Sequence, residues 1–308
     1  MQRSAMKASI LIFSQTGNTL KAGNSIVKGL VSAGFEVDQL SFLRRSRWKP
    51  DKADLIGIGS PVFENRPAEV VTDYLQESGF DFAGKKAFVF ITSGGSPAKS
   101  LWHLSQAIAR TGATVMGGIQ LRGASSFPTL FGLFPDRPDE KELEYAEDFG
   151  RAVAAGMTAG EQLPEYYRID PDRGGIFYDK VGPCLNYIKK KTTPLPESDH
   201  GKCDLCGNCV YECPTGSITV ENSLIKFHGT CIVCYRCWSI CPRNAISIKF
   251  SPGNGFIERL LYGERMERIF GDIKPGEYVG KNLYKDVLAR RIRLKYDRKN
   301  PTSVYEYK

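Results

Sequence analysis

The first 160 residues alternate short apolar runs with longer segments of helical periodicity. Apolar runs bounded by turn residues predict buried strands, and they occur at 8–14, 35–42, 54–60, 86–92 and 114–122. Segments with apolar residues three and four apart predict helices at 19–33, 68–77, 98–110 and 140–156. Strands that alternate with helices in this way predict an α/β fold with a doubly wound, five-stranded parallel sheet.

Three of the predicted strands end in loops of small and hydroxyl-bearing residues: SQTGNT at 14–19, SPVFENRP at 60–67 and TSGGSP at 92–97. In a doubly wound sheet, ligands bind at the carboxyl ends of the strands, where these loops lie. The first loop opens a helix, so its backbone N–H groups and hydroxyls favour a phosphate. It lacks the lysine of a GxxxxGK[ST] loop, which disfavours a nucleoside triphosphate with magnesium. The run GIGSP at 57–61 lacks the third glycine of GxGxxG, so no dedicated NAD(P)H site is predicted.

At these loops the chain resembles the flavodoxins, a family whose [ST]-x-T-G-x-T loop binds the phosphate of FMN. The resemblance covers the predicted α/β domain and implies that the two later loops hold the isoalloxazine ring, with Phe63 in contact with it. The FMN-binding residues that it implies are Ser14, Thr16, Gly17, Asn18, Thr19, Ser60, Pro61, Val62, Phe63, Thr92, Ser93, Gly94 and Gly95. A flavodoxin-like domain that binds another phosphate ligand, or no flavin, stays open as an alternative.

Eight of the nine cysteines form two runs of one spacing, C-x-x-C-x-x-C-x-x-x-C-P, and the second run lies 28 residues after the first. In this pattern three thiolates of a run bind one 4Fe-4S cluster, and the fourth binds the other cluster. The predicted ligands are Cys203, Cys206, Cys209 and Cys241 for one cluster, and Cys231, Cys234, Cys237 and Cys213 for the second. The stretch 199–250 resembles the bacterial-type two-cluster ferredoxins, which implies a small α+β domain.

Two other uses of these cysteines fit the spacing less well. Zinc prefers CxxC pairs separated by a spacer, so a third cysteine three residues on is awkward for it. A disulfide framework needs an oxidising compartment, and the start of the chain does not resemble a secretory segment. Cys184 fits neither cluster and is expected to be a buried or idle thiol.

Composition is ordinary for a soluble globular protein, with 42% hydrophobic and 25% charged residues among 308. No apolar run approaches the roughly 20 residues that span a bilayer, so no membrane span is expected. Cysteines that remain available to bind metal fit a reducing interior, so we expect a cytoplasmic protein. The net charge is +8, and 251–308 holds 13 Lys and Arg against 8 Asp and Glu. We interpret its basic run, 290–295, as a solvated helix face. The alternative is a dock for an acidic partner; no nucleic-acid partner is expected.

Four segments are predicted: a flavodoxin-like domain at 1–160, a proline-rich linker at 161–198, the ferredoxin domain at 199–250 and a basic extension at 251–308. This arrangement resembles the flavodoxin–ferredoxin fusion proteins of anaerobic microbes. The resemblance implies electron transfer between two 4Fe-4S clusters, FMN and an external partner, either another electron carrier or an oxidoreductase. One alternative is an FMN-dependent reductase of a small substrate, although no catalytic constellation is found. The other is a redox-sensing binding module.

Overall fold

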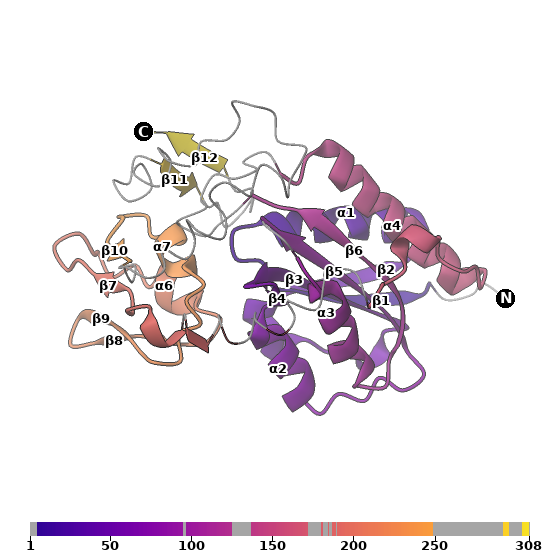
Figure 1. Cartoon of the computed structure of the whole chain (residues 1–308), viewed down its shortest axis with the longest axis horizontal. Coiled ribbons are helices and arrows are strands. Elements are labelled where there is room, and N and C mark those ends of the chain that lie inside the picture. The colour runs from indigo at the N-terminus through magenta and orange to yellow at the C-terminus, as the bar shows by residue number, and fades with distance from the viewer. Residues whose placement is uncertain are drawn as a thin grey trace. The chain divides into compact units, whose positions relative to one another are not determined.

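The computed structural model describes residues 5–94, 97–124, 137–171 and 190–248, single positions between 180 and 188, and the backbone of two strands near the C-terminus. The chain forms two compact units (Figure 1). The described residues up to Gly123 and from Arg137 to Pro171 belong to the first unit, and those from Cys184 onward belong to the second.

The first unit is built on a parallel sheet whose five main strands have the order β2-β1-β3-β5-β6. These strands are β1 (Lys7–Ile12), β2 (Glu36–Ser41), β3 (Leu55–Phe63), β5 (Lys86–Ser93) and β6 (Thr114–Arg122). Strand β1 pairs in parallel with both β2 and β3, so β2 lies on one side of β1 and the later strands lie on the other side. This order is that of flavodoxin-like doubly wound sheets. The predicted fold class is confirmed.

Helices cover both faces of the sheet (Figure 1). The helices α1 (Asn18–Ser32) and α4 (Glu140–Thr158) lie on one face, and α2 (Glu69–Glu77) and α3 (Ser100–Ala109) lie on the other. Side chains of β1 alternate between the two cores: Ile10 and Ile12 pack with α1 and α4, whereas Leu11 packs with α2 and α3. A strand buried on both faces reads as a continuous apolar run, which is why the strands were predictable.

Close contact between α1 and α4 depends on a pair of glycines. A Cβ atom on Gly29 would lie 2.1 Å from the carbonyl oxygen of Glu147. A Cβ atom on Gly150 would lie 2.3 Å from the carbonyl oxygen of Ile26. Both distances are far below van der Waals contact, so a side chain at either position would push the helices apart.

The segment 60–67, expected as a loop, is instead a hairpin. Strand β3 continues to Phe63, and β4 (Arg66–Pro67) turns back to pair with it in antiparallel fashion. The two turn residues, Glu64 and Asn65, have φ angles of 49° and 61°. Two successive left-handed residues are what a two-residue type I′ turn requires, and asparagine tolerates this conformation better than most residues.

The crossover from β2 to β3 contains two short 3-10 helices, η1 (Phe42–Arg47) and η2 (Pro50–Lys52), in place of an α-helix. Two aromatic residues hold it against the α2/α3 face of the sheet. Phe42 is 1% exposed and Trp48 is 3% exposed. The indole N–H of Trp48 donates to Ser9 Oγ on β1 at 2.7 Å. The crossover is therefore anchored by side chains.

The start of the predicted linker packs on the first unit. The 3-10 helix η3 (Glu165–Tyr167) buries Tyr167, whose ring centroid lies 4.8 Å from that of Phe149 on α4. Burial also raises the pKa of the Tyr167 hydroxyl far above its usual value, with Tyr145 and Tyr166 adding to the shift. The domain bounds remain predictions, but the described chain up to Tyr167 packs as part of the α/β unit.

The second unit is a small α+β structure that repeats itself. Helix α6 (Asn208–Tyr211) recurs 28 residues later as α7 (Arg236–Ile240). Strands β8 (Ile218–Glu221) and β9 (Leu224–Phe227) form one hairpin, and β7 (Glu197–Ser198) pairs with β10 (Ile246–Ser247). The start of the first repeat thus pairs with the end of the second, so neither repeat is complete alone.

The basic run near the C-terminus is not the helix face that we expected. Ile292–Lys295 forms strand β11, antiparallel to β12 (Val304–Tyr307). The sequence IRLK alternates apolar and basic residues, which is the period of a strand. Within the described part of the chain, no helix combines the length and apolar character needed to cross a bilayer.

Candidate cofactor sites

The three predicted FMN loops meet at one edge of the sheet. The register pairs Ile12 with Gly59 and Pro61 with Thr92, so the carboxyl ends of β1, β3 and β5 lie within a few residues of one another at the same edge. The hydroxyls of Thr19 and Thr92 lie 2.7 Å apart and are hydrogen-bonded, although 73 residues separate them. This bond ties the helix that follows the first loop to the end of β5.

The first loop has the geometry of a phosphate-binding loop. Gly17, with φ of 103°, is the N-cap of α1, and the first turn of the helix has no acidic residue. Ser14 Oγ accepts hydrogen bonds from the N–H groups of Gly17 (3.1 Å) and Leu20 (3.2 Å). Backbone donors at the positive end of a helix therefore already point at an oxygen acceptor. The donor set fits the oxygens of a phosphate group.

In the hairpin at 60–67, Phe63 is partly accessible to a ligand, whereas the Ser60 hydroxyl is buried and hydrogen-bonded within the protein. Phe63 is half-buried at the end of β3, and its ring lies edge-on to Phe13 at a centroid distance of 6.2 Å. Ser60 is fully buried; its hydroxyl accepts from the N–H of Ala68 (3.0 Å) and donates to the carbonyl of Pro61 (2.9 Å). The Ser60 side chain thus supports the hairpin.

The third loop begins at Thr92, Ser93 and Gly94, while Gly95 lies outside the described residues. The end of β6 reaches this place as well, because the N–H of Gly123 donates to the carbonyl of Ser93 at 3.0 Å. A Cβ atom on Gly123 would lie 3.1 Å from that of Asn18 in the first loop. Sequence reasoning did not include β6 in the site.

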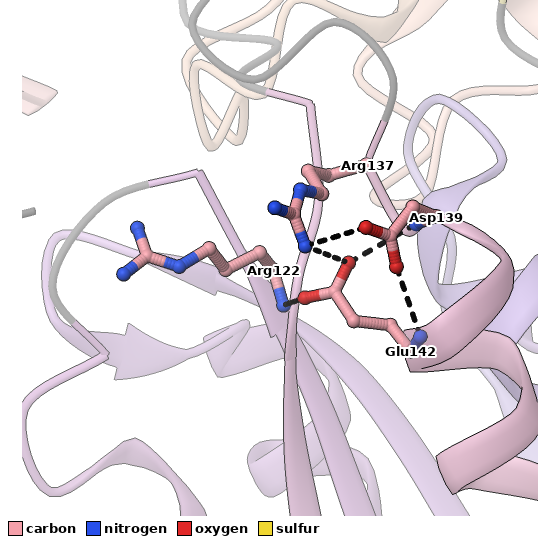
Figure 2. Close-up of polar contacts among 4 residues, drawn as sticks. All are labelled: Arg122, Arg137, Asp139 and Glu142. Atoms are coloured by element: carbon pink, nitrogen blue, oxygen red, sulfur yellow. Dashed lines mark hydrogen bonds and ion pairs between the residues drawn. The ribbon is translucent and has the colours of Figure 1, made fainter. Parts of the chain in front are cut away.

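A network of charged residues fixes the end of β6 to the start of α4 (Figure 2). One carboxylate oxygen of Glu142 accepts from the N–H of Arg122 at 3.0 Å. The other accepts from the N–H of Asp139 at 3.1 Å and pairs with the Arg137 guanidinium at 3.2 Å. Asp139 in turn accepts from the N–H of Glu142 at 3.0 Å, completing a capping box. The D-x-x-E pattern before a helix was a readable sequence signal for it.

In the second unit, the eight repeated cysteines form two groups. The first pocket is lined by Cys203, Cys206, Cys209 and Cys241. The second pocket is lined by Cys213, Cys231, Cys234 and Cys237. Each group takes three thiols from one run and the fourth from the other run, as the sequence pattern predicts. None of the nine cysteines, all within the described residues, forms a disulfide, and the Cys184 thiol, expected to be buried or idle, is exposed.

Electrostatic coupling is strongest within each group, although Cys209 of the first group also adds to the raised pKa of Cys237 in the second. Burial raises the pKa of Cys209 to about 11, and Cys241, Cys203 and Cys206 add to the shift. Burial raises the pKa of Cys234 to about 12, with Cys231 and Cys213 as the neighbouring thiols. Thiols that must lose protons to act as ligands are thus held close together in a low-dielectric place, where a cationic metal centre would stabilise the thiolates.

The backbone around the thiols repeats a rare conformation. Left-handed φ angles occur at Leu205 (53°) and Gly207 (70°), and at their counterparts Val233 (56°) and Tyr235 (59°). Apart from glycine, these residue types avoid that conformation, which is most costly for a β-branched valine. Alternation with left-handed residues turns successive N–H groups toward one side, and such concavities hold many iron–sulfur centres. The backbone fits an anionic cluster.

Further N–H groups donate to the sulfur atoms. The fourth cysteine of each run accepts a hydrogen bond from the residue four positions on: Ser217 N to Cys213 Sγ (3.3 Å) and Ala245 N to Cys241 Sγ (3.2 Å). Such donors favour the thiolate form. Among the described residues, no three His, Cys, Asp or Glu side chains converge on a point as the ligands of a single ion do. The thiols surround a space instead.

A buried ion pair lies beside the second group. Arg236, at the start of α7, and Glu212, at the end of α6, have side chains 2% and 7% exposed, with an N–O distance of 2.5 Å. At the counterpart positions the first repeat has Asn208, and the second has Ile240. The ion pair therefore has no equivalent beside the first group of thiols. It connects α6 of the first repeat to α7 of the second.

Comparison with known proteins identifies one segment of the second unit. Residues 196–219 match the family model described as a 4Fe-4S binding domain, which includes the first cysteine run. No curated protein matches the chain.

Solved structures similar to the chain include two flavodoxins and an oxidoreductase. A flavodoxin from the domain Archaea is 22% identical over 48% of this chain and 96% of its own, with a TM-score of 0.39. The two-electron reduced flavodoxin of Megasphaera elsdenii is 26% identical over 46% and 98%, with a TM-score of 0.35. Rubredoxin oxygen:oxidoreductase of Desulfovibrio gigas is 16% identical over 51% and 37%, with a TM-score of 0.41.

The strand order and the matched segment characterise different parts of the chain. The first unit has the flavodoxin-like order β2-β1-β3-β5-β6. The second contains a 4Fe-4S binding domain, which marks it as an iron–sulfur electron-transfer unit. The chain therefore joins a flavodoxin-like α/β unit to a unit that contains a 4Fe-4S binding domain.

Proposed function

We propose that the chain transfers electrons between two 4Fe-4S clusters, one FMN and an external redox partner. The observation that supports this most is the grouping of eight thiols into two sets of four, each set combining both runs. A phosphate-type loop on the same chain, at the edge of a flavodoxin-like sheet, supports the flavin.

The residues of each site would have distinct tasks. The first set of thiols is Cys203, Cys206, Cys209 and Cys241, and the second is Cys213, Cys231, Cys234 and Cys237. The loop from Ser14 to Thr19, at the start of α1, would bind the flavin phosphate, and Phe63 would border the ring. When bound, the clusters supply one-electron transfer and FMN supplies one- or two-electron transfer.

The side chains that touch no cofactor would keep these groups in place. The Thr19–Thr92 hydrogen bond fixes the spacing of the first and third loops, and Ser60 closes the hairpin that presents Phe63. The N–H groups of Ser217 and Ala245 favour the anionic form of the sulfurs that they contact. Preorganisation of this kind lets a centre change charge with little movement of the protein.

Analysis of the anaerobically reconstituted full chain tests the proposal. We expect about eight irons, eight sulfides and one FMN per chain, from four thiolates per cluster. Cys203→Ala and Cys241→Ala should each remove about four irons and abolish the same paramagnetic resonance signal. Cys213→Ala and Cys231→Ala should abolish the other signal, while Cys184→Ala is the matched control and keeps all the iron.

Two results would contradict these assignments. If Cys203→Ala and Cys213→Ala abolished the same signal, each cluster would belong to one run, and the crossed grouping would be wrong. Bound zinc in place of iron would refute the clusters. For the flavin, riboflavin is the matched control ligand, because it lacks the phosphate that the first loop is proposed to bind. Equal affinity for FMN and riboflavin would refute that role of the loop.

A further inference from the structure

The two halves of the cysteine repeat differ in how they face solvent. Leu205 is 41% exposed, whereas its counterpart Val233 is 6% exposed. Cys206 is exposed, whereas its counterpart Cys234 is only partly exposed. Tyr235 in the second loop is 3% exposed. The two sites share one sequence spacing, but only the first has fully exposed residues between its first and third cysteines, whereas those of the second loop are half-buried or buried.

Asn208 and its counterpart Arg236 show the same asymmetry. Asn208 in the first loop is half-buried, whereas Arg236 in the second is 2% exposed and paired with the buried Glu212. A guanidinium and a carboxylate thus lie in the interior on the second side. Among the eight repeated thiols, all within the described residues, only Cys206 of the first site is fully exposed, so an electron could leave the protein there over a short distance.

The exposed face of the first site has an apolar centre and a balanced rim. Leu205, Cys206 and Gly207 line the first pocket and lie at least partly at the surface. Two exposed ion pairs flank them: Lys202 with Asp199, and Arg243 with Asp204, each at 2.8 Å. The rim therefore has two positive and two negative charges. Apolar centres with polar rims are typical of protein–protein interfaces.

We propose that this face, Leu205–Gly207, is the surface at which an external redox protein docks and exchanges electrons with the chain. This inference rests on the proposed function. The positive and negative charges of the rim balance, so a strongly charged partner surface would find no net opposite charge to attract it. The rim therefore fits a partner whose redox centre is surrounded by apolar, weakly charged surface. The second site then serves as the interior centre.

Point variants of the full, reconstituted chain test this docking face. The chain is reduced with dithionite, desalted anaerobically and mixed with a small c-type cytochrome; each ferric haem that becomes ferrous takes one electron from the chain. Leu205→Glu and Leu205→Lys are each expected to slow cytochrome reduction about tenfold or more, as loss of a central apolar contact does. If only charge mattered, one variant would reduce the cytochrome faster than the parent chain and the other more slowly.

Val220→Glu is the matched control. Val220 is 49% exposed on β8 and lines neither cysteine pocket. It should leave the rate of cytochrome reduction unchanged. Reduction of a small dye, 2,6-dichlorophenolindophenol, should be equal in all variants, because a dye needs no docking face.

The outcomes separate this inference from the proposed function. If the chain binds no iron, the proposed function is wrong. If iron content and reduction potentials are those of the parent chain but both Leu205 variants reduce the cytochrome at the parent rate, the docking face is wrong.

Discussion

The buried pair of Arg236 and Glu212 gives the sharpest prediction about the second unit. Both side chains are more than nine-tenths buried, and together they join the end of α6 to the start of α7. Arg236→Met would leave the Glu212 carboxylate buried without its cation. Removing one partner of a buried pair costs about 3–5 kcal/mol. Because tenfold in an equilibrium constant is 1.4 kcal/mol, protection of the α6 and α7 amides from hydrogen exchange should fall at least about 100-fold.

Hydrogen exchange measured by mass spectrometry on the full, reconstituted chain resolves this change by segment, so the first unit is an internal reference. Arg151→Met is the matched control, since Arg151 pairs with Glu147 and Asp148 on the exposed face of α4. It should leave protection unchanged. The double variant Arg236→Met with Glu212→Leu should recover most of the loss, because an apolar pair can replace a buried ion pair. Equal, small effects of Arg236→Met and Arg151→Met would refute the reasoning.

Three further predictions concern the first unit. Gly17→Ala places a side chain at φ of 103°, which costs about 1–2 kcal/mol, so FMN affinity measured by fluorescence quenching should fall about five- to thirtyfold. Gly34→Ala is the matched control: it places a side chain at a similar φ of 88°, with no neighbour within 4 Å of the Cβ, outside the three loops. Unchanged FMN affinity in both variants would contradict phosphate binding by the first loop. Glu142→Gln weakens the capping box and the contact with β6, so thermal unfolding of the first unit should show a loss of about 0.5–2 kcal/mol; a midpoint equal to that of Glu147→Gln would contradict this. Gly29→Ala should destabilise the same unit by about 1–3 kcal/mol, because α1 and α4 must separate, and an unchanged midpoint would show that they do not.

The sheet could be predicted from the sequence because its central strands, β1, β3 and β5, are buried on both faces and its strands are mostly separated by amphipathic helices. The loop at 14–19 and the cysteine pattern were equally readable as motifs, since short fixed spacings reflect local geometry. The hairpin at Glu64 and Asn65 was not found, because its turn lacks the Asn-Gly or Asp-Gly pair that marks a type I′ turn.

Other features depend on contacts between distant residues. Leu205, Val233 and Tyr235 adopt left-handed backbone conformations that their residue types disfavour, so local propensity argues against the observed structure. Strain of this kind occurs where the surrounding structure over-determines the backbone, as at ligand sites. The strand at Ile292–Lys295 is a different case, because its period-two alternation was present in the sequence and a helix was favoured instead.

Anaerobic reductive titration of the full chain tests most directly whether one chain contains three connected redox centres. Each cluster accepts one electron and FMN accepts two, so the account predicts an uptake of about four electrons per chain. It further predicts that electrons supplied through the clusters change the flavin absorbance. An uptake of about two electrons, or a flavin absorbance that stays constant while the clusters are reduced, would contradict the account.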